Sequence, residues 1–251
     1  MKIWQWIVFG VILYVLGLIV YAPASLITSL IHQASNAQIS IAEPKGTVFS
    51  GSAAKVSFNG IVVNDVNWHL SPLHLLLLKA TIDVKGGAIR DMEQAYVSGR
   101  ASVSLVNFQN ISLQDMQTFI PVKSILAQVK LPVFITAEGR VRVNIQSLQA
   151  DPSCLHLLGV GGWQNASIAD NGKVTQLGSF DANLNCNNGQ YTINIDEQNI
   201  LNLDANITVG IDGSYQVNGK FKPDPTLPTE IKQAASFFGR ANSQGFYEIK
   251  L

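Results

Sequence analysis

The sequence predicts an all-β domain, mostly antiparallel, that follows a single membrane-spanning helix and contains one or two short helices. Three observations lead to this prediction. The first twenty residues are almost entirely apolar, short runs after Gln38 alternate apolar and polar side chains, and Gly, Asn, Ser and Pro separate those runs. Such runs with turn residues between them are typical of antiparallel strands. The 251 residues suffice for one large or two small domains.

The N-terminal segment has the length and composition of a transmembrane helix. Residues 3–21 contain no charge. At about 1.5 Å per residue they would reach about 28 Å, close to a hydrocarbon core of roughly 30 Å. Trp4 and Trp6 at one end and Tyr21 at the other belong to the residue types that prefer the membrane interface. We therefore expect residues 1–24 to form a short cytoplasmic N-terminus and an uncleaved signal anchor.

The charges around this segment predict its orientation. Lys2 and the amino group precede it, and the next positive charge is Lys45. The positive-inside rule therefore places the N-terminus in the cytoplasm and everything after Tyr21 outside. A cleaved signal peptide is the alternative, because Ala-Pro-Ala at 22–24 resembles a cleavage site. The apolar run exceeds the usual h-region of about 7–15 residues, which favours the anchor.

Residues 25–37 are expected to connect the anchor to the β domain. Leu26, Ile27, Leu30 and Ile31 recur at helical spacing after Pro23. This pattern indicates a juxtamembrane helix followed by a short linker. The β domain would then occupy residues 38–251.

The second half of the chain has the clearest strand pattern. Val141, Val143 and Ile145 alternate with polar residues, and similar alternation returns over 191–195 and 203–211. The stretches CNNGQ and IDGSY supply turns between neighbouring antiparallel strands. One apolar and one polar face predict a meander with one covered side.

Two short helices are predicted beside the strands. Ser112 has the chemistry of a helix cap, and a helix from it would run toward Phe119 and end at Pro121. Thr229 precedes the stretch EIKQAASFF, and Gly239 would supply a C-terminal residue in the left-handed conformation.

The two cysteines, Cys154 and Cys186, favour a single disulfide. An even count in a cysteine-poor chain outside the cytoplasm is typical of such a bond. Two buried free thiols are the alternative.

Charge and motif content argue against catalysis, metal binding and nucleic-acid binding. The 17 basic and 17 acidic residues give zero net charge, so there is no basic footprint for nucleic acid. The sequence has no G-x-S-x-G elbow, no H-E-x-x-H helix and no phosphate-binding glycine loop. His69 and His74 are separated by Pro72. Cys154 and His156 have no further ligand cluster beside them. We expect neither an enzyme nor a cofactor.

The run Leu75–Leu78 is far too short to span a bilayer. Pro72 interrupts the local pattern and Lys79 ends the run. We expect a short bend whose leucines are buried under the sheet. The alternative is an apolar contact or groove for lipid or for another protein's apolar segment. The candidate residues for it are Trp68, Leu70, Leu73, Leu75, Leu76, Leu77 and Leu78.

Several motifs accompany this run in one order along the chain. They are GTVFSG at Gly46–Gly51, VNWHLSPLHLLL, EGRVRVNI, GGWQNA, the cysteine pair and the closing GFYEIKL. This succession resembles the type II secretion system protein N family of Gram-negative bacteria. The resemblance implies a family turn at Gly46, Thr47, Phe49 and Gly51, with Phe49 where we expect tryptophan.

The resemblance also implies a location and a function. It implies a single-pass inner-membrane protein with a periplasmic β domain that assists export of folded proteins across the outer membrane. Its partners would be the inner membrane, other type II secretion components and lipid. The family is distantly similar to AsmA-like proteins, whose curved sheets or two-layer β grooves hold lipid. An AsmA-like lipid-binding or lipid-transport protein is therefore the alternative.

Overall fold

The structure is a computed structural model. It describes residues 38–128, 136–170 and 173–250, together with Trp4, Gly10, Val11, Tyr14, Gly17, residues 21–25, Thr28 and Ser35. Trp6, most of the predicted anchor and most of the predicted linker lie outside these residues. No helix formed by the described residues is long and apolar enough to cross a membrane.

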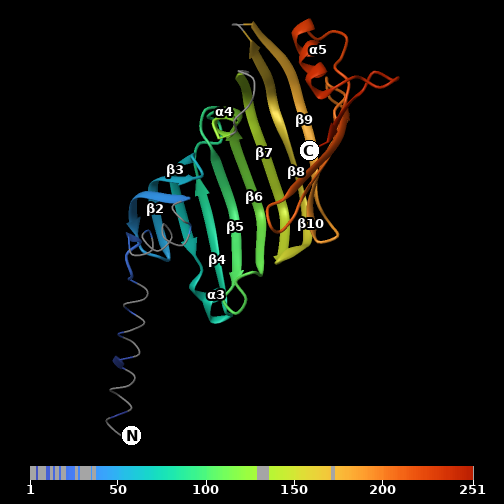
Figure 1. Ribbon diagram of the computed structural model, residues 1–251. Coiled ribbons are helices and arrows are strands. Elements are labelled where there is room, and N and C mark those ends of the chain that lie inside the picture. The colour runs from blue at the N-terminus through green and yellow to red at the C-terminus, as the bar shows by residue number, and fades with distance from the viewer. Residues whose placement is uncertain are drawn as a thin grey trace.

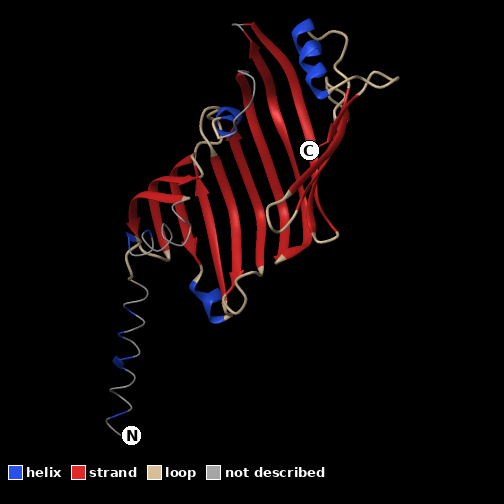
Figure 2. Cartoon of the chain, in the orientation of Figure 1, coloured by secondary structure: helices blue, strands red, loops and turns tan. Residues whose placement is uncertain are grey.

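A single antiparallel sheet forms the β domain (Figures 1 and 2). In the described ranges the sheet has thirteen strands, and each strand pairs with the next one in the sequence. The strands are β1 (Ile39–Gly46), β2 (Ser50–Phe58), β3 (Ile61–Leu70), β4 (Lys79–Gly86), β5 (Tyr96–Ser104), β6 (Ile111–Pro121), β7 (Thr136–Asp151), β8 (Ser153–Asp170), β9 (Lys173–Asn187), β10 (Gln190–Ile195), β11 (Asp204–Val209), β12 (Tyr215–Phe221) and β13 (Tyr247–Lys250). The predicted all-β antiparallel meander is confirmed.

Short helices lie in the connections between strands (Figure 2). They are α3 (Pro72–Leu76), α4 (Val122–Leu126), α5 (Thr229–Ala235) and the 3-10 turn η1 (Ser236–Phe238). The helix predicted after Thr229 is confirmed, although Thr229 is its first residue and Pro228 precedes it. Gly239 ends η1 with a positive φ of 111° but a ψ of −154°, which is outside the predicted left-handed helical region.

The helix predicted from Ser112 toward Phe119 is wrong, because this segment forms strand β6. It pairs along its length with β5 and β7. The ladders to these two strands use the backbone N–H and C=O groups of the segment, so the extended conformation is favoured over a helix. Pro121 ends a strand as readily as a helix, because it lacks the backbone N–H that a continuing ladder needs.

The sheet has one apolar face that later parts of the chain cover. Trp163 pairs directly with Phe180, so the two side chains lie on the same face. Phe180 is buried in a cluster with Ala166, Leu177 and Leu227, against which Ile200, Leu201, Leu203 and Ile231 pack. Because these later segments return over this face, it is the inner face, and the opposite one is the outer face.

Bulges and positive backbone angles bend the strands within this sheet. The pairing register shifts between Ser98 and Arg100 in β5 and at three places between β7 and β8. Asp65 and Asp115 have φ near +50° inside their strands. Such irregularities increase the local twist of a strand. The result is the curved sheet in Figure 1, one of the two arrangements that the likeness to AsmA-like proteins implied.

The buried apolar core of the β domain is small. Among the described residues, no large side chain is completely buried, and many of the buried apolar residues are alanines. Trp163 and Phe180 stack with ring centroids 5.6 Å apart, at the buried cluster of the inner face. The predicted covered side is therefore covered most fully near the C-terminal strands.

Candidate functional site

The GTVFSG stretch forms the turn between β1 and β2. Thr47 N–H donates to the Ser50 carbonyl at 2.9 Å, and Ser50 N–H donates to the Thr47 hydroxyl at 3.1 Å. Gly46 adopts a φ of +84°, and a Cβ there would lie 2.6 Å from the Ser50 oxygen. The turn therefore requires glycine at position 46.

Trp68 of β3 ties this turn to the leucine segment. Its Nε1 donates to the Val48 carbonyl at 3.2 Å, and Leu70 N–H donates to the Phe49 carbonyl at 2.7 Å. A Cβ on Gly51 would lie only 2.5 Å from the indole ring. The motif turn and the Trp68 motif, separated in the sequence, are thus parts of one local structure.

The chain from the N-terminal segment joins the sheet at this turn. Ala24 N–H donates to the Gly46 carbonyl at 3.1 Å, and Val48 N–H donates to the Ala22 carbonyl at 3.0 Å. Pro23 and Thr47 form an isolated β-bridge between these bonds. Ala24 is 4% exposed. Residues 22–24 are therefore held as a short extra strand segment beside the turn.

An apolar cavity of about 260 Å³ lies beside this junction. Its wall is almost entirely apolar and comes from the inner face of β1–β4. The lining residues are Ala24, Thr28, Ile41, Val48, Val56, Val66, Trp68, Leu70, Ile82 and Val84. The cavity can hold apolar groups and offers little to a polar ligand.

Beyond the cavity, an apolar row crosses the inner face. Direct pairing places Met116, Ile145, Gly159, Leu184, Ile193, Ile207 and Val217 side by side on β6–β12. Several of these side chains are only half-buried. The inner face is therefore an extended apolar trough rather than a filled core.

The candidate residues for an apolar contact or groove lie in two places. Trp68 and Leu70 line the cavity, whereas Leu73, Leu76, Leu77 and Leu78 are exposed by 55–80% on and after α3. The preferred prediction that these leucines are buried under the sheet is therefore wrong. Pro72 stands in the first turn of α3, where its missing N–H costs nothing, and starts a helix that projects from the strand ends. Leu75 is half-buried.

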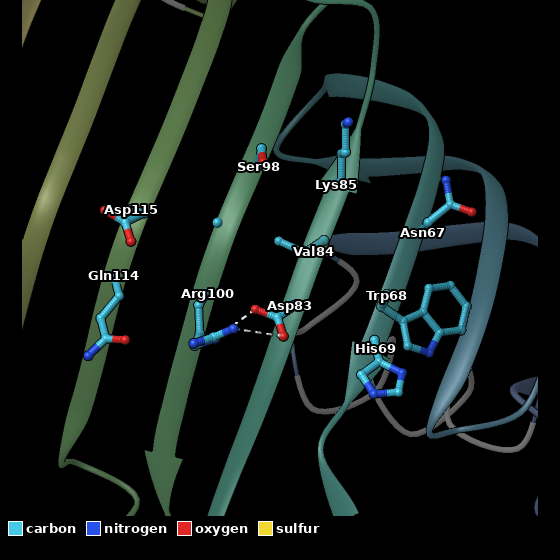
Figure 3. Close-up of a pocket in the computed structure, with 11 residues that line it drawn as sticks. Asn67, Trp68, His69, Asp83, Val84, Lys85, Ser98, Arg100, Gln114 and Asp115 are labelled. Atoms are coloured by element: carbon cyan, nitrogen blue, oxygen red, sulfur yellow. Dashed lines mark hydrogen bonds and ion pairs between the residues drawn. The ribbon is translucent and has the colours of Figure 1, made fainter.

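A depression of about 420 Å³, lined by both polar and apolar groups, lies on the outer face across β3–β6 (Figure 3). Asp83 and Arg100 form a bidentate pair there, with Nε–Oδ1 and Nη2–Oδ2 distances of 2.7 and 3.3 Å. The hydrogen bond to Asp83 raises the pKa of Arg100 further above its ordinary value. Both side chains are about half exposed. The pair holds the Arg100 guanidinium in place as a positive charge. It does not create a base or a nucleophile near neutral pH.

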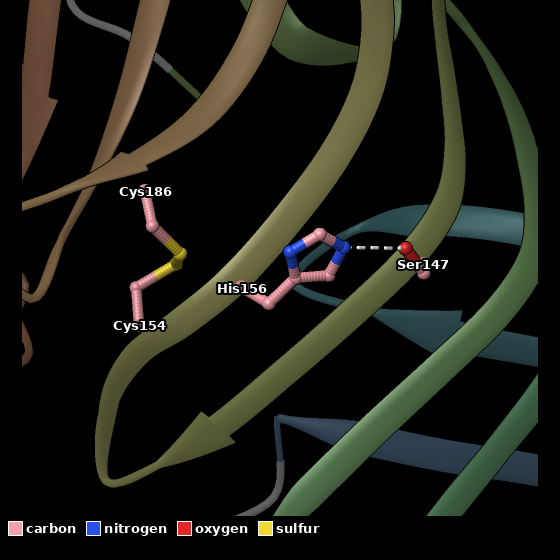
Figure 4. Close-up of a disulfide and its surroundings, with 4 residues drawn as sticks. All are labelled: Ser147, Cys154, His156 and Cys186. Carbon is pink, nitrogen blue, oxygen red and sulfur yellow. Dashed lines mark hydrogen bonds between the residues drawn. A yellow bond between two sulfur atoms is a disulfide. The ribbon is translucent and has the colours of Figure 1, made fainter.

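The predicted disulfide between Cys154 and Cys186 is confirmed (Figure 4). It joins the start of β8 to the end of β9, beside the Asn188–Gly189 turn. His156 lies apart from it and contacts the Ser147 hydroxyl through Nε2 at 3.0 Å. Within the described ranges no three His, Cys, Asp or Glu side chains gather closely enough to hold a metal ion.

The sequence predictions located part of this site. The motif residues Gly46, Thr47, Phe49 and Gly51 do lie together. Of the predicted interface residues, Trp4 and Tyr21 are 72% and 80% exposed. The cavity residues on β1, β2 and β4 were missed, although their alternation was the available signal. Val106 and Phe108, exposed beside α3, carried no signal.

The fold and site define a class of protein: a single antiparallel sheet curved around an apolar trough, with its N-terminal segment fastened to a motif turn. The family model for type II secretion system protein N matches residues 37–250. The chain is 28% identical over 250 residues to type II secretion system protein N of Pectobacterium carotovorum, covering 98% of this chain and 96% of that protein. It is 25% identical over 207 residues to the Vibrio cholerae protein of that name, covering 81% and 80%.

The chain belongs to the type II secretion system protein N family. A third relative with this name, from Aeromonas hydrophila, is 21% identical over 238 residues, covering 93% and 91%. No solved structure matches the chain. The protein is thus a component of type II secretion, which moves proteins out of the cell.

Proposed function

We propose that this protein is an inner-membrane-anchored periplasmic accessory of type II secretion that assists export of folded proteins through protein–protein contacts. One observation carries the proposal: the apolar segment 3–21 leads directly into residues 22–24, which are hydrogen-bonded to the family turn. Family membership supplies the secretion role. The motif turn then acts as the joint between the anchor and the sheet.

The contacts with other secretion components run through a face of the sheet rather than through its edge strands. The edge strand β1 contains Pro44, which cannot donate to an added strand, and Glu43 with a positive φ of 51°. The other edge strand, β13, has only four residues, and Glu248 and Lys250 form an ion pair on it. Both features discourage strand addition.

A deletion strain tests the secretion role. We expect release of a folded exoprotein to fall when the gene is deleted and to return with the wild-type gene. A variant in which residues 2–21 are replaced by a cleavable signal peptide should reach the periplasm without restoring release. Normal release from the deletion strain, with unchanged amounts of the other secretion components, would rule the role out.

A second function, lipid binding by the trough, is favoured by the apolar cavity. Val66, Ile82, Val84 and neighbouring apolar residues form its wall. The space that they enclose can hold part of an acyl chain or of another apolar segment. Mass spectrometry of the purified full chain should find co-purified lipid. The variant Ile82→Trp, which fills the cavity, should lose it. Equal lipid in both proteins would place the lipid outside the cavity.

A further inference from the structure

Six exposed apolar side chains gather where α3 meets the β5–β6 loop. They are Leu73, Leu76, Leu77, Leu78, Val106 and Phe108, and each is between 55% and 80% exposed. We call this surface the leucine tip. The two segments are joined by a hydrogen bond of 2.8 Å from Leu105 N–H to the Leu78 carbonyl. An apolar cluster of this size on a protein surface marks a contact.

The loop half of the leucine tip is held in a fixed shape. The Ser104 hydroxyl accepts the N–H groups of Val106 and Asn107 at 3.3 Å, and Asn107 Oδ1 accepts Gln109 N–H at 3.1 Å. These local bonds satisfy the loop backbone. Val106 and Phe108 are therefore displayed by an ordered loop instead of folding back onto the sheet.

The charges around the leucine tip suit a lipid surface. Residues 70–82 and 101–114 contain no acidic residue, while Lys79 is exposed beside the leucines. The Asp151 carboxylate is nearby, and it accepts hydrogen bonds from the side chains of Asn107 and Asn110 at 2.8 and 3.4 Å. Apolar side chains flanked by a cation are the composition of interfacial membrane contacts.

The leucine tip lies next to the place where the N-terminal segment joins the sheet. Ala22 bonds to Val48 in the motif turn, and the next residue of that turn, Phe49, bonds to Leu70 just before α3. Tyr21, immediately before this junction, is 80% exposed. In Figure 1 α3 stands at the lower end of the strands and α5 at the upper end. The tip thus projects at the end of the sheet that receives the predicted anchor.

We propose that the leucine tip inserts into the periplasmic surface of the bilayer that holds residues 3–21. The occupant of this surface is lipid: the headgroup and upper acyl region of the inner membrane. The inference rests on the proposed anchoring. The protein then has two attachments to the membrane, a spanning one and an interfacial one, and the second fixes the orientation of the trough relative to the bilayer.

Single-cysteine probes on the full chain in vesicles test this contact. The native cysteines are paired, so Leu77→Cys and Val106→Cys can each be labelled with a polarity-sensitive fluorophore. Vesicles of phosphatidylethanolamine and phosphatidylglycerol would carry doxyl-labelled lipid as the membrane-borne quencher, with iodide as the water-borne one. Phe237→Cys, 82% exposed near α5, is the matched control. Val11→Cys reports on the anchor itself.

We expect lipid quenching at positions 77, 106 and 11, and iodide quenching at 237. In a background of Leu73→Asp and Leu76→Asp, both at exposed positions, lipid quenching at 106 should be lost while that at 11 remains. If positions 77 and 106 are quenched by iodide while 11 is quenched by lipid, the interfacial contact is wrong and the anchor stands. Protection from both quenchers would mean that a second copy covers the tip, which also overturns the proposal. Failure at position 11 would instead defeat the proposed anchoring.

Discussion

At the scale of single residues, the motif turn is set by a few close approaches. Gly51 lies under the Trp68 ring, and Gly46 takes a backbone angle that other residues rarely adopt. These glycines are needed because the turn packs an indole, a carbonyl and the incoming residues 22–24 into one small space. The two glycines of the motif are therefore explained by this packing.

The variant Gly51→Ala tests this packing. The new methyl group would meet the indole at 2.5 Å and the Lys45 carbonyl at 2.6 Å, so we expect a loss of about 1–3 kcal/mol in the free energy of unfolding. Gly161→Ala, on the same face, should cost less, because its nearest atoms are at 3.3 and 3.9 Å. Denaturant unfolding in detergent would measure both. Equal stability of the two variants would contradict the packing described.

Hydrogen bonds at the β11–β12 turn lower the pKa of Asp212, and this shift can be measured. The Ser214 hydroxyl donates to Asp212 Oδ1 at 2.6 Å, and the Ser214 N–H donates to the same oxygen at 2.9 Å. Because these bonds favour the charged form, the pKa of Asp212 lies below its ordinary value of 3.8. The stabilisation is present above the unfolded pKa and is lost as the pH falls through the folded one.

Titration by NMR would check this pKa. Ser214→Ala removes the side-chain bond, so the pKa of Asp212 should rise toward 3.8. Asp224, whose pKa is lowered mainly by the Thr226 hydroxyl, is the internal control and should not move. An unchanged Asp212 in the variant would show that the hydroxyl is not the cause.

At the scale of elements, the C-terminal strands could be predicted and the leucine segment could not. The alternation over 191–195 and the Asn-Gly turn fix β10 and its partner β9, because both signals are local. Whether Leu76 is buried depends instead on whether another element lies over α3, which local sequence does not state. The helix predicted from Ser112 was wrong for a related reason. A residue type that often caps helices also fits in a strand when strands on both sides pair with it.

The motif turn shows an intermediate case. Its residues could be grouped by their resemblance to a family, but the joint with residues 22–24 depends on hydrogen bonds between segments that carry no shared pattern. The cavity was equally hidden, because its wall is assembled from one to three residues of each of four strands, together with residues from outside them. The pairing register between strands determines which side chains meet at such a site, and the sequence of a single strand does not reveal that register.

The disulfide gives a prediction at this scale. It closes a separation of 32 residues, so reduction should lower the free energy of unfolding by roughly 3–4 kcal/mol in the chain-entropy model. The double variant Cys154→Ala and Cys186→Ala should match the reduced wild type. His156→Ala, which removes only an exposed hydrogen bond to Ser147, should change stability far less. Identical unfolding curves with and without reductant would contradict a structural role for the bond.

At the scale of the whole molecule, the two faces of the sheet have different chemistry. On the outer face, direct pairing aligns Asn183, Asn194, Asn206 and Asn218 across four strands, and Asn206 Nδ2 donates to Asn194 Oδ1 at 2.6 Å. Uncharged amides thus make this face polar in a chain with only 14% charged residues. The inner face, by contrast, carries the apolar row and the apolar cavity.

The arrangement has a consequence for secretion. A tether, a joint built by the motif turn and an interfacial leucine tip would hold the trough in one orientation at the membrane surface. Partners or lipid would then meet a defined face instead of a freely rotating domain. This orientation depends on the β domain lying on the periplasmic side.

The side of the membrane on which the β domain lies can be measured with one engineered cysteine. A membrane-impermeant maleimide would be added to spheroplasts that carry Phe237→Cys, with Lys2→Cys in a second strain as the cytoplasmic control. Labelling of position 237 in intact spheroplasts, and of position 2 only after lysis, is the result we predict. Labelling of position 237 only after lysis would place the sheet in the cytoplasm and contradict the account.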